Sequence, residues 1–249
     1  GGGPFVGAPV LSALSALRCG ADWVTIACPK NISPIVSSFS PNLIVKPLSS
    51  VILNENDVPF IIDLMKKHDV IVIGMGLGNA DETVEAVKSI IKESKKAVID
   101  ADGLYGVELP AKKGIIITPH AGELSKMGDI VLPDGLEERI IFLKEFSKKN
   151  NLVTLMKGRE DIISDGEKVK INRTGNAGMT VGGTGDVLSG IVGAFYAITD
   201  NPFLAASAGA FVSGSAGDLA FVEGGYGLLA TDVLENIPKV LKNKMERLL

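Results

Sequence analysis

A run of glycines that ends in an aspartate is the first feature of this sequence that could do chemistry. Six glycines fall within residues 175–190, in RTGNAGMTVGGTGDVLSG, and an apolar stretch typical of a helix follows. Glycine costs chain entropy, so such a cluster needs a reason. Gly182, Gly183 and Gly185 would let backbone amides approach an anion. A helix from about Thr184 would direct the positive end of its dipole to the same place. The motif therefore predicts a phosphate-binding site.

Asp186 would lie in the first turn of that helix, where a carboxylate is favoured electrostatically. A plain helix-capping role is the alternative. A carboxylate beside an anion site can also take the proton of a hydroxyl while the amides stabilise a transferring phosphoryl group. The residues thus predict a protein that binds a phosphate-bearing ligand and uses Asp186 as a base, and they leave the substrate open.

Other residues suited to a site follow predicted strands. Gly74, Gly76 and Gly78 come after VIVIG, but their spacing departs from the dinucleotide pattern G-x-G-x-x-G, and a tight structural turn explains them equally well. His120 follows GIIIT, where we favour a functional role over a structural hydrogen bond. Ligands bind beyond the carboxyl ends of strands in open parallel sheets, so these positions are candidates.

Two further strand ends carry charged residues. Lys157 precedes Gly158 in LMKGREDIIS, and VIDADGL contains Asp100 and Asp102. An ordinary polar turn accounts for each of them, so neither segment is by itself a site.

The elements that must position these residues alternate along the chain. Helical patterns cover 8–19, 57–68 (with Asp57 as N-cap), 81–94 and 135–148; strand patterns cover 23–28, 43–47, 70–74, 97–100, 114–118 and 152–156. Strands 161–164 and 168–171 flank the turn signal DGE, and the last third is helical, with breaks near residues 202 and 224–227. The order predicts one α/β domain with a mostly parallel sheet covered by helices on both faces.

Composition excludes several classes of protein. The 249 residues are 46% hydrophobic with a net charge of −4, which argues against disorder and against a nucleic-acid partner. Cys19 and Cys28 predict two buried thiols rather than a disulfide framework, and two histidines make no histidine-rich metal site. We expect a cytoplasmic protein without a membrane partner, because no leader is visible and 203–222 is rich in Gly and Ser. No strand precedes Gly1, so a missing natural beginning and an upstream domain are both open.

Several segments, in this order and spacing, resemble the NAD(P)H-hydrate dehydratases of the ribokinase-like superfamily. They are TPHAGEL, MKGREDIISDG and GNAGMTVGGTGDVLSGIVGAF, with GAPVLSALSALRCGADWVTIA and IGMGLG in support. The resemblance implies a three-layer ribokinase-like fold. It also implies repair of (S)-NADHX and (S)-NADPHX: ADP or ATP, with Mg²⁺, phosphorylates the added hydroxyl, and elimination of phosphate restores NADH or NADPH. ADP is the expected donor, since the likeness is closer to ADP-using microbial members.

The same resemblance assigns the site. Asp186 would be the catalytic base and contact the hydrate, together with Ala8, Gly78 and His120. Expected nucleotide-binding residues are Lys157, Gly158, Arg159, Glu160, Asp161, Asn176, Ala177, Gly178, Met179, Thr180, Val181, Gly182, Gly183, Thr184 and Gly185; metal ligands are not predicted. The sequence departs from the family in reading KGRED, because Glu160 and Asp161 would repel a polyphosphate unless they face elsewhere.

Two other functions remain as alternatives. A ribokinase-like kinase acting on a vitamin-precursor alcohol would use the same loop and aspartate, and a nucleotide-sensing module would have lost turnover. A nicotinamide dehydrogenase is disfavoured, because the strongest glycine loop lies late in the chain. We also expect a homo-oligomer, with a tetramer as its form, and an epimerase as a fused or separate partner.

Overall fold

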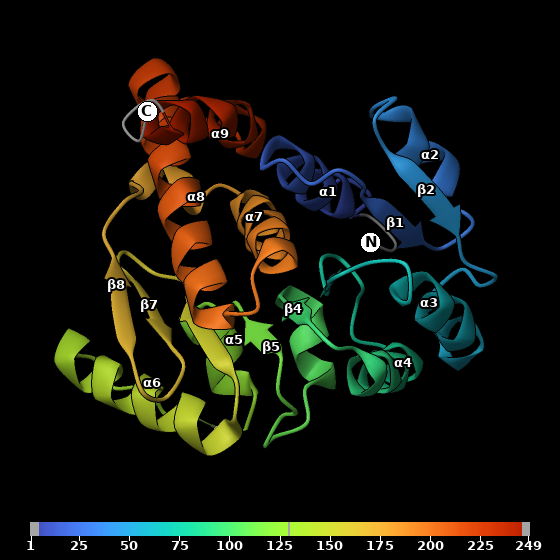
Figure 1. Ribbon diagram of the computed structural model, residues 1–249, viewed down its shortest axis with the longest axis horizontal. Helices are drawn as coiled ribbons and strands as arrows, with labels where there is room; N and C mark the ends of the chain where they lie inside the picture. Colours follow the sequence, from blue (N-terminus) through green and yellow to red (C-terminus); the bar gives the residue numbers. More distant parts are fainter. Residues whose placement is uncertain (1–4, 129, 246–249) are drawn as a thin grey trace.

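The computed structural model describes residues 5–128 and 130–245. Gly1, before which the sequence predicts no strand, lies outside the described residues. A six-stranded sheet lies between two layers of helices, and a separate two-stranded sheet near the N-terminus lies apart from it (Figure 1).

The central sheet has the strand order β3-β4-β5-β6-β7-β8. Its strands are β3 (Ile71–Ile73), β4 (Ala97–Ile99), β5 (Ile115–Ile117), β6 (Val153–Met156), β7 (Asp161–Ser164) and β8 (Val169–Asn172). The first four are parallel, β7 is antiparallel to β6, and β8 is antiparallel to β7. The prediction of a mostly parallel sheet is confirmed.

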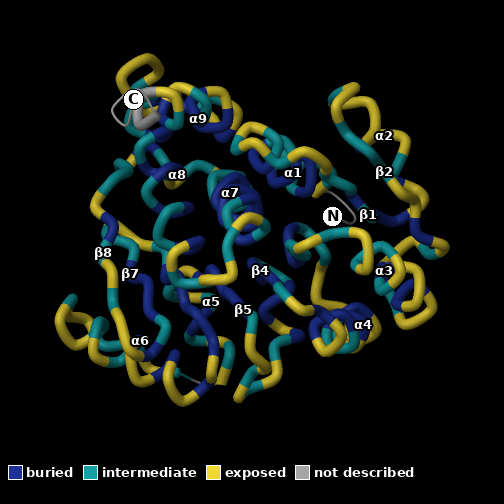
Figure 2. Tube along the Cα trace, in the orientation of Figure 1, coloured by how far each residue is buried: buried dark blue, intermediate teal, exposed yellow. Residues whose placement is uncertain are grey.

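Alternate residues of the central strands face opposite helical layers. Val98 and Ile116 lie in an apolar cluster with α7 (Thr184–Ile198) and α8 (Pro202–Gly224). Their neighbours Ile99 and Ile117 lie in a second cluster with α4 (Asp81–Glu93) and α6 (Leu136–Asn150). Strands buried on both faces read as continuous apolar runs, as these do. Three layers result, and Figure 2 shows β4, β5 and most of α7 buried between exposed outer surfaces.

Two N-terminal strands depart from the expected single sheet. β1 (Thr25–Cys28) and β2 (Ile44–Pro47) pair with each other in parallel as a separate two-stranded sheet. The short α2 (Ser33–Ser38), which was not predicted, connects them. Cys28 is buried in β1 and Cys19 is half-buried, and both are free thiols.

Asp57 is the N-cap residue of α3 (Val58–Met65), as predicted, and it also ends the short helix η1 (Glu55–Asp57). Its side chain, however, makes no capping hydrogen bond. Its Oδ1 accepts hydrogen bonds from the Ser49 backbone nitrogen at 2.9 Å and from Ser49 Oγ at 2.6 Å. The segment after β2 approaches closely enough to take the carboxylate, which spacing along the chain could not reveal.

The predicted hairpin turn at 165–167 is confirmed. Asp165 Oδ1 accepts from the backbone nitrogens of Glu167 and Lys168, at 2.9 and 2.7 Å, and Gly166 has a φ of 90°. The predicted helical C-terminal third is also present, as α7, α8 and α9 (Ala230–Met245). Within the described part of the chain, no helix is long and apolar enough to cross a membrane.

Helix α1 (Ala8–Arg18) lies against α7 at a glycine (Figure 1). A Cβ at Gly190 would lie 2.0 Å from the carbonyl oxygen of Ser12 and 2.1 Å from Ser15 Oγ. Only a glycine permits this approach. One of the six glycines in the motif is therefore explained by helix packing and not by a ligand.

Candidate active site

The start of α7 is held by its own loop. Gly183, the N-cap residue, has a φ of 98°, a left-handed conformation that favours glycine. Thr184 Oγ1 donates to the carbonyl oxygens of Met179 and Val181, at 2.8 and 3.1 Å. The loop before the helix is thereby fixed, and Asp186 lies in the first helical turn as predicted.

A buried ion pair lies beside this helix start. Asp100 follows β4, and its Oδ1 accepts from Lys157 Nζ at 2.7 Å and from Thr118 Oγ1 at 2.8 Å. Lys157 follows β6, and its backbone nitrogen donates to the Pro119 carbonyl oxygen at 2.8 Å. The pair is set by three adjacent parallel strands that end at the same edge of the sheet. The side chain of Asp100 is 3% exposed and that of Lys157 is 19% exposed.

Gly185 brings the helix start close to this pair. A Cβ at Gly185 would lie 3.5 Å from Lys157 Nζ and 3.8 Å from Asp100 Oδ2. One small region is therefore surrounded by the Lys157 ammonium, the carboxylates of Asp100 and Asp186, and the positive end of the α7 dipole. Such a region can bind the charged oxygens of a phosphoryl group.

The electrostatic environment makes Asp186 a plausible base. Its pKa is raised from 3.8 to about 6, mainly by burial and also by the charge of Asp100, while Lys157 acts in the opposite direction. Lys157 loses solvation on burial, but Asp100 and Glu123 outweigh that loss and leave the pKa of its ammonium raised. A cationic lysine beside a weakly basic carboxylate suits proton transfer combined with stabilisation of a phosphoryl group.

His120 begins the short helix α5 (Ala121–Lys126) and forms a capping box with Glu123. His120 Nδ1 accepts from the Glu123 backbone nitrogen at 3.1 Å, and Glu123 Oε2 accepts from the His120 backbone nitrogen at 2.8 Å. The same Oε2 lies 3.5 Å from Lys157 Nζ. The capping glutamate thus connects the histidine to the ion pair.

A strained turn links the ion pair to the glycines after β3. Ala101 has a φ of 47°, in the left-handed region that ordinary residues rarely adopt. On one side of it Asp100 faces Lys157, and on the other Asp102 Oδ2 accepts from the Gly78 backbone nitrogen at 2.8 Å. The turn continues into η2 (Ala101–Gly106). Because the backbone at Ala101 is left-handed, the carboxylates of Asp100 and Asp102 reach different partners.

The glycines after β3 differ in their surroundings. A Cβ at Gly74 would lie 1.7 Å from the Asp100 carbonyl oxygen, and one at Gly76 would lie 2.6 Å from Phe5 Cβ and 3.6 Å from that of Ala8. No atom lies within 4 Å of a Cβ built at Gly78. Gly74 is thus required by packing, whereas Gly78 leaves space, as expected of a residue next to a ligand.

A cavity of about 320 Å³ opens between η2 and α5. Its wall combines apolar and aromatic side chains with polar ones: Ala101, Asp102, Leu104, Tyr105, Val107, His120, Glu123, Lys126 and Met127. Because Glu123 reaches both this cavity and Lys157, the cavity adjoins the ion pair.

The structure therefore brings together Asp186, Gly185, Lys157 and His120. Through Asp102 it adds Gly78, and Ala8 lies near the same glycine loop. The sequence predicts only a polar turn at Asp100 and assigns no role to Thr118 or Glu123. Thr118 directly follows β5 at this edge, and Glu123 is the third residue of α5, where a capping-box glutamate is common.

The side chains of several predicted nucleotide-binding residues face the protein. Asn176 Nδ2 donates to the Gly217 carbonyl oxygen and to Asp218 Oδ1, both at 3.0 Å, and its Oδ1 accepts from Gly178 at the start of η3 (Ala177–Thr180). A Cβ at Gly217 would lie 2.1 Å from the sulfur of Met179. Any contact of these residues with a nucleotide would go through the backbone.

The acidic residues of KGRED have protein partners. Asp161 accepts from the Gly158 backbone nitrogen at 3.1 Å and from Asn172 Nδ2 at 2.9 Å. Burial raises the pKa of Asp161, and these hydrogen bonds and Lys157 oppose that effect. Glu160 Oε1 accepts from Arg173 Nε at 2.7 Å. Both carboxylates therefore have partners within the protein.

The remaining predicted loop positions are open. Gly158, Arg159, Ala177, Thr180 and Gly182 are exposed. A Cβ at Gly182 would meet no atom within 4 Å, whereas one at Gly183 would lie 2.7 Å from Leu11 Cδ1. Gly182 is thus the glycine of this loop with free space in front of it.

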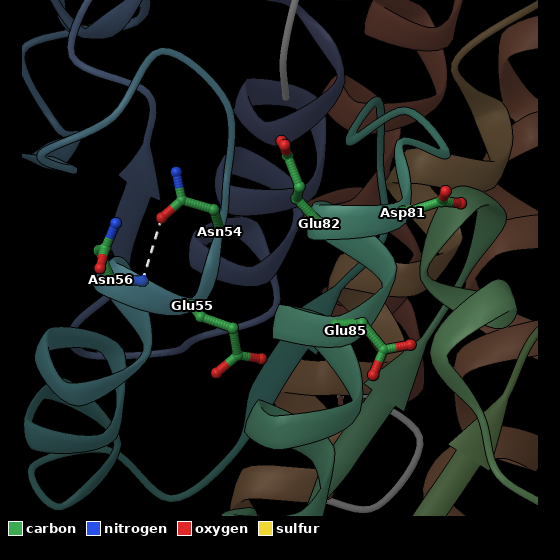
Figure 3. A pocket seen from close by; sticks show the side chains of 6 residues that line it. All are labelled: Asn54, Glu55, Asn56, Asp81, Glu82 and Glu85. Carbon is green, nitrogen blue, oxygen red and sulfur yellow. Dashed lines mark hydrogen bonds between the residues drawn. The ribbon is translucent and has the colours of Figure 1, made fainter.

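A second hollow, of about 520 Å³, lies between η1 and α4 (Figure 3). Its carboxylates have structural explanations: Asp81 and Glu82 lie in the first turn of α4, and Glu55 accepts from Ser89 Oγ at 2.9 Å. Among the described residues, no group of three or more His, Cys, Asp or Glu could hold a metal ion.

Sequence comparisons identify relatives of the whole chain. A sequence model of the NAD(P)H-hydrate dehydratases matches residues 1–239. A bifunctional NAD(P)H-hydrate repair enzyme of Archaeoglobus fulgidus is 45% identical over 97% of this chain and 49% of its own length. An ADP-dependent (S)-NAD(P)H-hydrate dehydratase of Nitrosopumilus maritimus is 37% identical over 97% of this chain and 86% of its own. The chain thus spans about half the length of the bifunctional relatives it matches.

Solved structures show the same fold. The ADP/ATP-dependent NAD(P)H-hydrate dehydratase of Bacillus subtilis, co-crystallised with ATP and Mg²⁺ and soaked with CoA, has a TM-score of 0.83. It is 24% identical, over 98% of this chain and 89% of its own. A ribokinase-like superfamily protein of Enterococcus faecalis has a TM-score of 0.80 at 22% identity, over 96% of this chain and 83% of its own. With its ribokinase-like fold and a family match over residues 1–239, this chain belongs to the NAD(P)H-hydrate dehydratase family.

Proposed function

We propose that this chain catalyses the nucleotide-dependent dehydration of (S)-NADHX and (S)-NADPHX to NADH and NADPH. The observation that carries the proposal is the position of Asp186 at the start of α7, beside the buried Asp100–Lys157 pair and with a pKa of about 6. Relatives that carry the name of this activity support it.

In the first step, Asp186 takes the proton of the hydrate hydroxyl. The hydroxyl oxygen bonds to the terminal phosphorus of the nucleotide, and the bond from that phosphorus to the bridging oxygen breaks. The α7 N-terminus and Lys157 stabilise the charge on the transferring group. ADP leaves as AMP, or ATP as ADP.

In the second step, the carbon–oxygen bond of the phosphorylated hydrate breaks. Phosphate leaves with that electron pair, the neighbouring ring carbon releases a proton to solvent, and the ring double bond forms. Hydroxide is a poor leaving group and phosphate a good one, which explains why the dehydration needs a nucleotide.

The nucleotide would lie along the two exposed loops that contain Gly158 and Gly182. ADP is the proposed donor, because the Nitrosopumilus relative is named as ADP-dependent. The described residues do not form a metal site of their own, and Lys157 already engages Asp100 and Glu123. Mg²⁺ in nucleotide enzymes commonly keeps phosphate oxygens as ligands, so we propose that it enters with the nucleotide.

The test is a time course of absorbance in the reduced nicotinamide band, with NADHX, Mg²⁺ and either ADP or ATP. A nucleotide-dependent rise, with release of inorganic phosphate, is expected, and the faster nucleotide identifies the donor. Folded protein that binds nucleotide but gives a flat trace would contradict the proposal. A kinase would instead leave a stable phosphorylated product, and a sensing module would bind without turnover.

We further propose two kinds of partner. The extra length of the bifunctional relatives supports an epimerase acting with this chain, fused or separate. Exposed aromatic side chains, including Trp23 and Phe39, support a homo-oligomer, for which a tetramer is expected. Light scattering after size-exclusion chromatography would measure its mass.

A further inference from the structure

The capping box of α5 points to a defined chemical role for His120. We infer that His120 acts in the proposed reaction only as a hydrogen-bond donor, through Nε2, to the carbonyl oxygen of the substrate's carboxamide. Glu123 is the positioning residue that holds the ring for this purpose. The inference rests on the proposed function and specifies which substrate group the cavity recognises.

The backbone determines the tautomer of His120. A backbone nitrogen always donates, so Nδ1, which lies 3.1 Å from the Glu123 nitrogen, must be the acceptor. The neutral ring therefore carries its proton on Nε2. Nε2 lies 3.5 Å from Glu123 Oε1, farther than a hydrogen bond of good geometry. A base needs a free lone pair, and in this ring the lone pair is already engaged by the cap.

The ring position is fixed on two sides. Glu123 Oε2 accepts from the His120 backbone nitrogen at 2.8 Å, which closes the capping box. A Cβ at Gly122 would lie 3.1 Å from His120 Cε1 and 3.3 Å from Nδ1, so the ring lies over the first turn, where a larger residue would crowd it. Glycine at this position is thus part of the arrangement that orients Nε2.

The cavity beside His120 has the chemistry of a carboxamide site. The side chain of His120 is 58% exposed, and it lines the cavity together with Asp102 and Tyr105. A carboxamide offers one acceptor oxygen and two N–H donors. His120 Nε2–H matches the oxygen, the Asp102 carboxylate matches the amide nitrogen, and Tyr105 offers a flat apolar surface to a ring.

Glu123 connects this cavity to the phosphoryl site. One carboxylate contacts the His120 backbone and lies 3.5 Å from Lys157 Nζ. Glu123 therefore contacts both His120, which would bind the carboxamide, and Lys157, which would face the phosphate. This arrangement can set the distance between the ring and the transferring phosphoryl group.

A pair of substitutions separates the donor from the cap. His120→Asn keeps an acceptor at the position of Nδ1, and Asn is a good N-cap, but the distal donor is lost. His120→Gln keeps an N–H donor near the position of Nε2 and weakens the cap. We expect His120→Asn to raise KM for NADHX about tenfold with little change in kcat, the effect of an unpaired carbonyl. His120→Gln should retain a KM near that of the parent.

The outcome is decisive in both directions. A fall in kcat of about 10² or more with unchanged KM, in either variant, would indicate a base and overturn the inference. A normal KM in His120→Asn together with a raised KM in His120→Gln would show that substrate binding depends on the helix cap. That result would also overturn the inference. Thermal midpoints of both variants report whether the fold is intact. Gly122→Ala, which crowds the ring without changing its chemistry, should raise KM in the same sense as His120→Asn.

A binding titration with NADH distinguishes this inference from the proposed function. If the parent protein binds NADH but does not turn over NADHX, the proposed function fails. Weaker NADH binding by His120→Asn than by His120→Gln would then still support the donor role. Equal binding by the two variants would overturn it.

Discussion

At Asp186, burial and neighbouring charge oppose the ionised form that catalysis requires. Asp186→Asn should lower turnover by a factor of about 10² to 10⁴, the usual contribution of a general base. The same variant should melt at a higher temperature than the parent at neutral pH, because it removes a poorly solvated charge next to Asp100. Steady-state rates and thermal unfolding measure both effects. Near-full activity would show that another group is the base.

The pH dependence of the reaction follows from the same carboxyl group. Since Asp186 must be ionised to act, kcat/KM should rise with pH through about 6. Asp100 raises this pKa and Lys157 lowers it, so Asp100→Asn should move the acid limb to lower pH and Lys157→Met to higher pH. If the acid limbs of the two variants do not move, or move in the same direction, Asp186 is not the group whose ionisation controls the rate.

The contribution of Asp186 to the free energy of unfolding should fall with rising pH, whereas kcat/KM rises. The folded-state pKa of Asp186 lies above its ordinary 3.8, so the folded state binds this proton more tightly. This contribution to the free energy of unfolding is present below pH 3.8 and is lost as the pH rises to about 6. Comparing the parent with Asp186→Asn by urea unfolding across that window isolates it.

At the scale of elements, two glycines of one motif serve different purposes. Gly190→Ala should destabilise the protein by about 1–3 kcal/mol, because its Cβ would meet the backbone of α1. Gly182→Ala should change stability by less than about 1 kcal/mol, because nothing lies in front of it, and should weaken ADP binding. Urea unfolding and nucleotide titration of both variants separate the two roles. Unchanged ADP binding by Gly182→Ala would show that the loop backbone does not face phosphate.

At the scale of the whole molecule, the proposed site draws on distant parts of the chain, from Ala8 in α1 to Asp186 in α7. A ligand that binds there should therefore stabilise the fold as a unit. At an ADP concentration of about 100 times Kd, the gain is about 2.7 kcal/mol. Thermal unfolding with increasing ADP measures this gain, and Gly182→Ala should show a smaller shift. A parent protein whose midpoint does not respond to ADP would argue against nucleotide binding.

Sequence pattern alone was sufficient where the cause is local. It predicted the helix that carries Asp186, the strand end at His120, the hairpin at 165–167 and the mostly parallel sheet. In each case, residues within a few positions of one another determine the result: alternation and periodicity set strands and helices, and glycine and aspartate set turns.

Only the tertiary structure decided which side chains meet. Asp100 and Lys157 are 57 residues apart, and they pair because parallel strands bring their carboxyl ends to one edge. The same long-range packing paired β1 with β2 alone, required Gly190 for α1, and gave Glu160 and Asp161 partners within the protein. A sequence determines where chemistry can occur along the chain, but contacts between distant segments depend on how the layers pack.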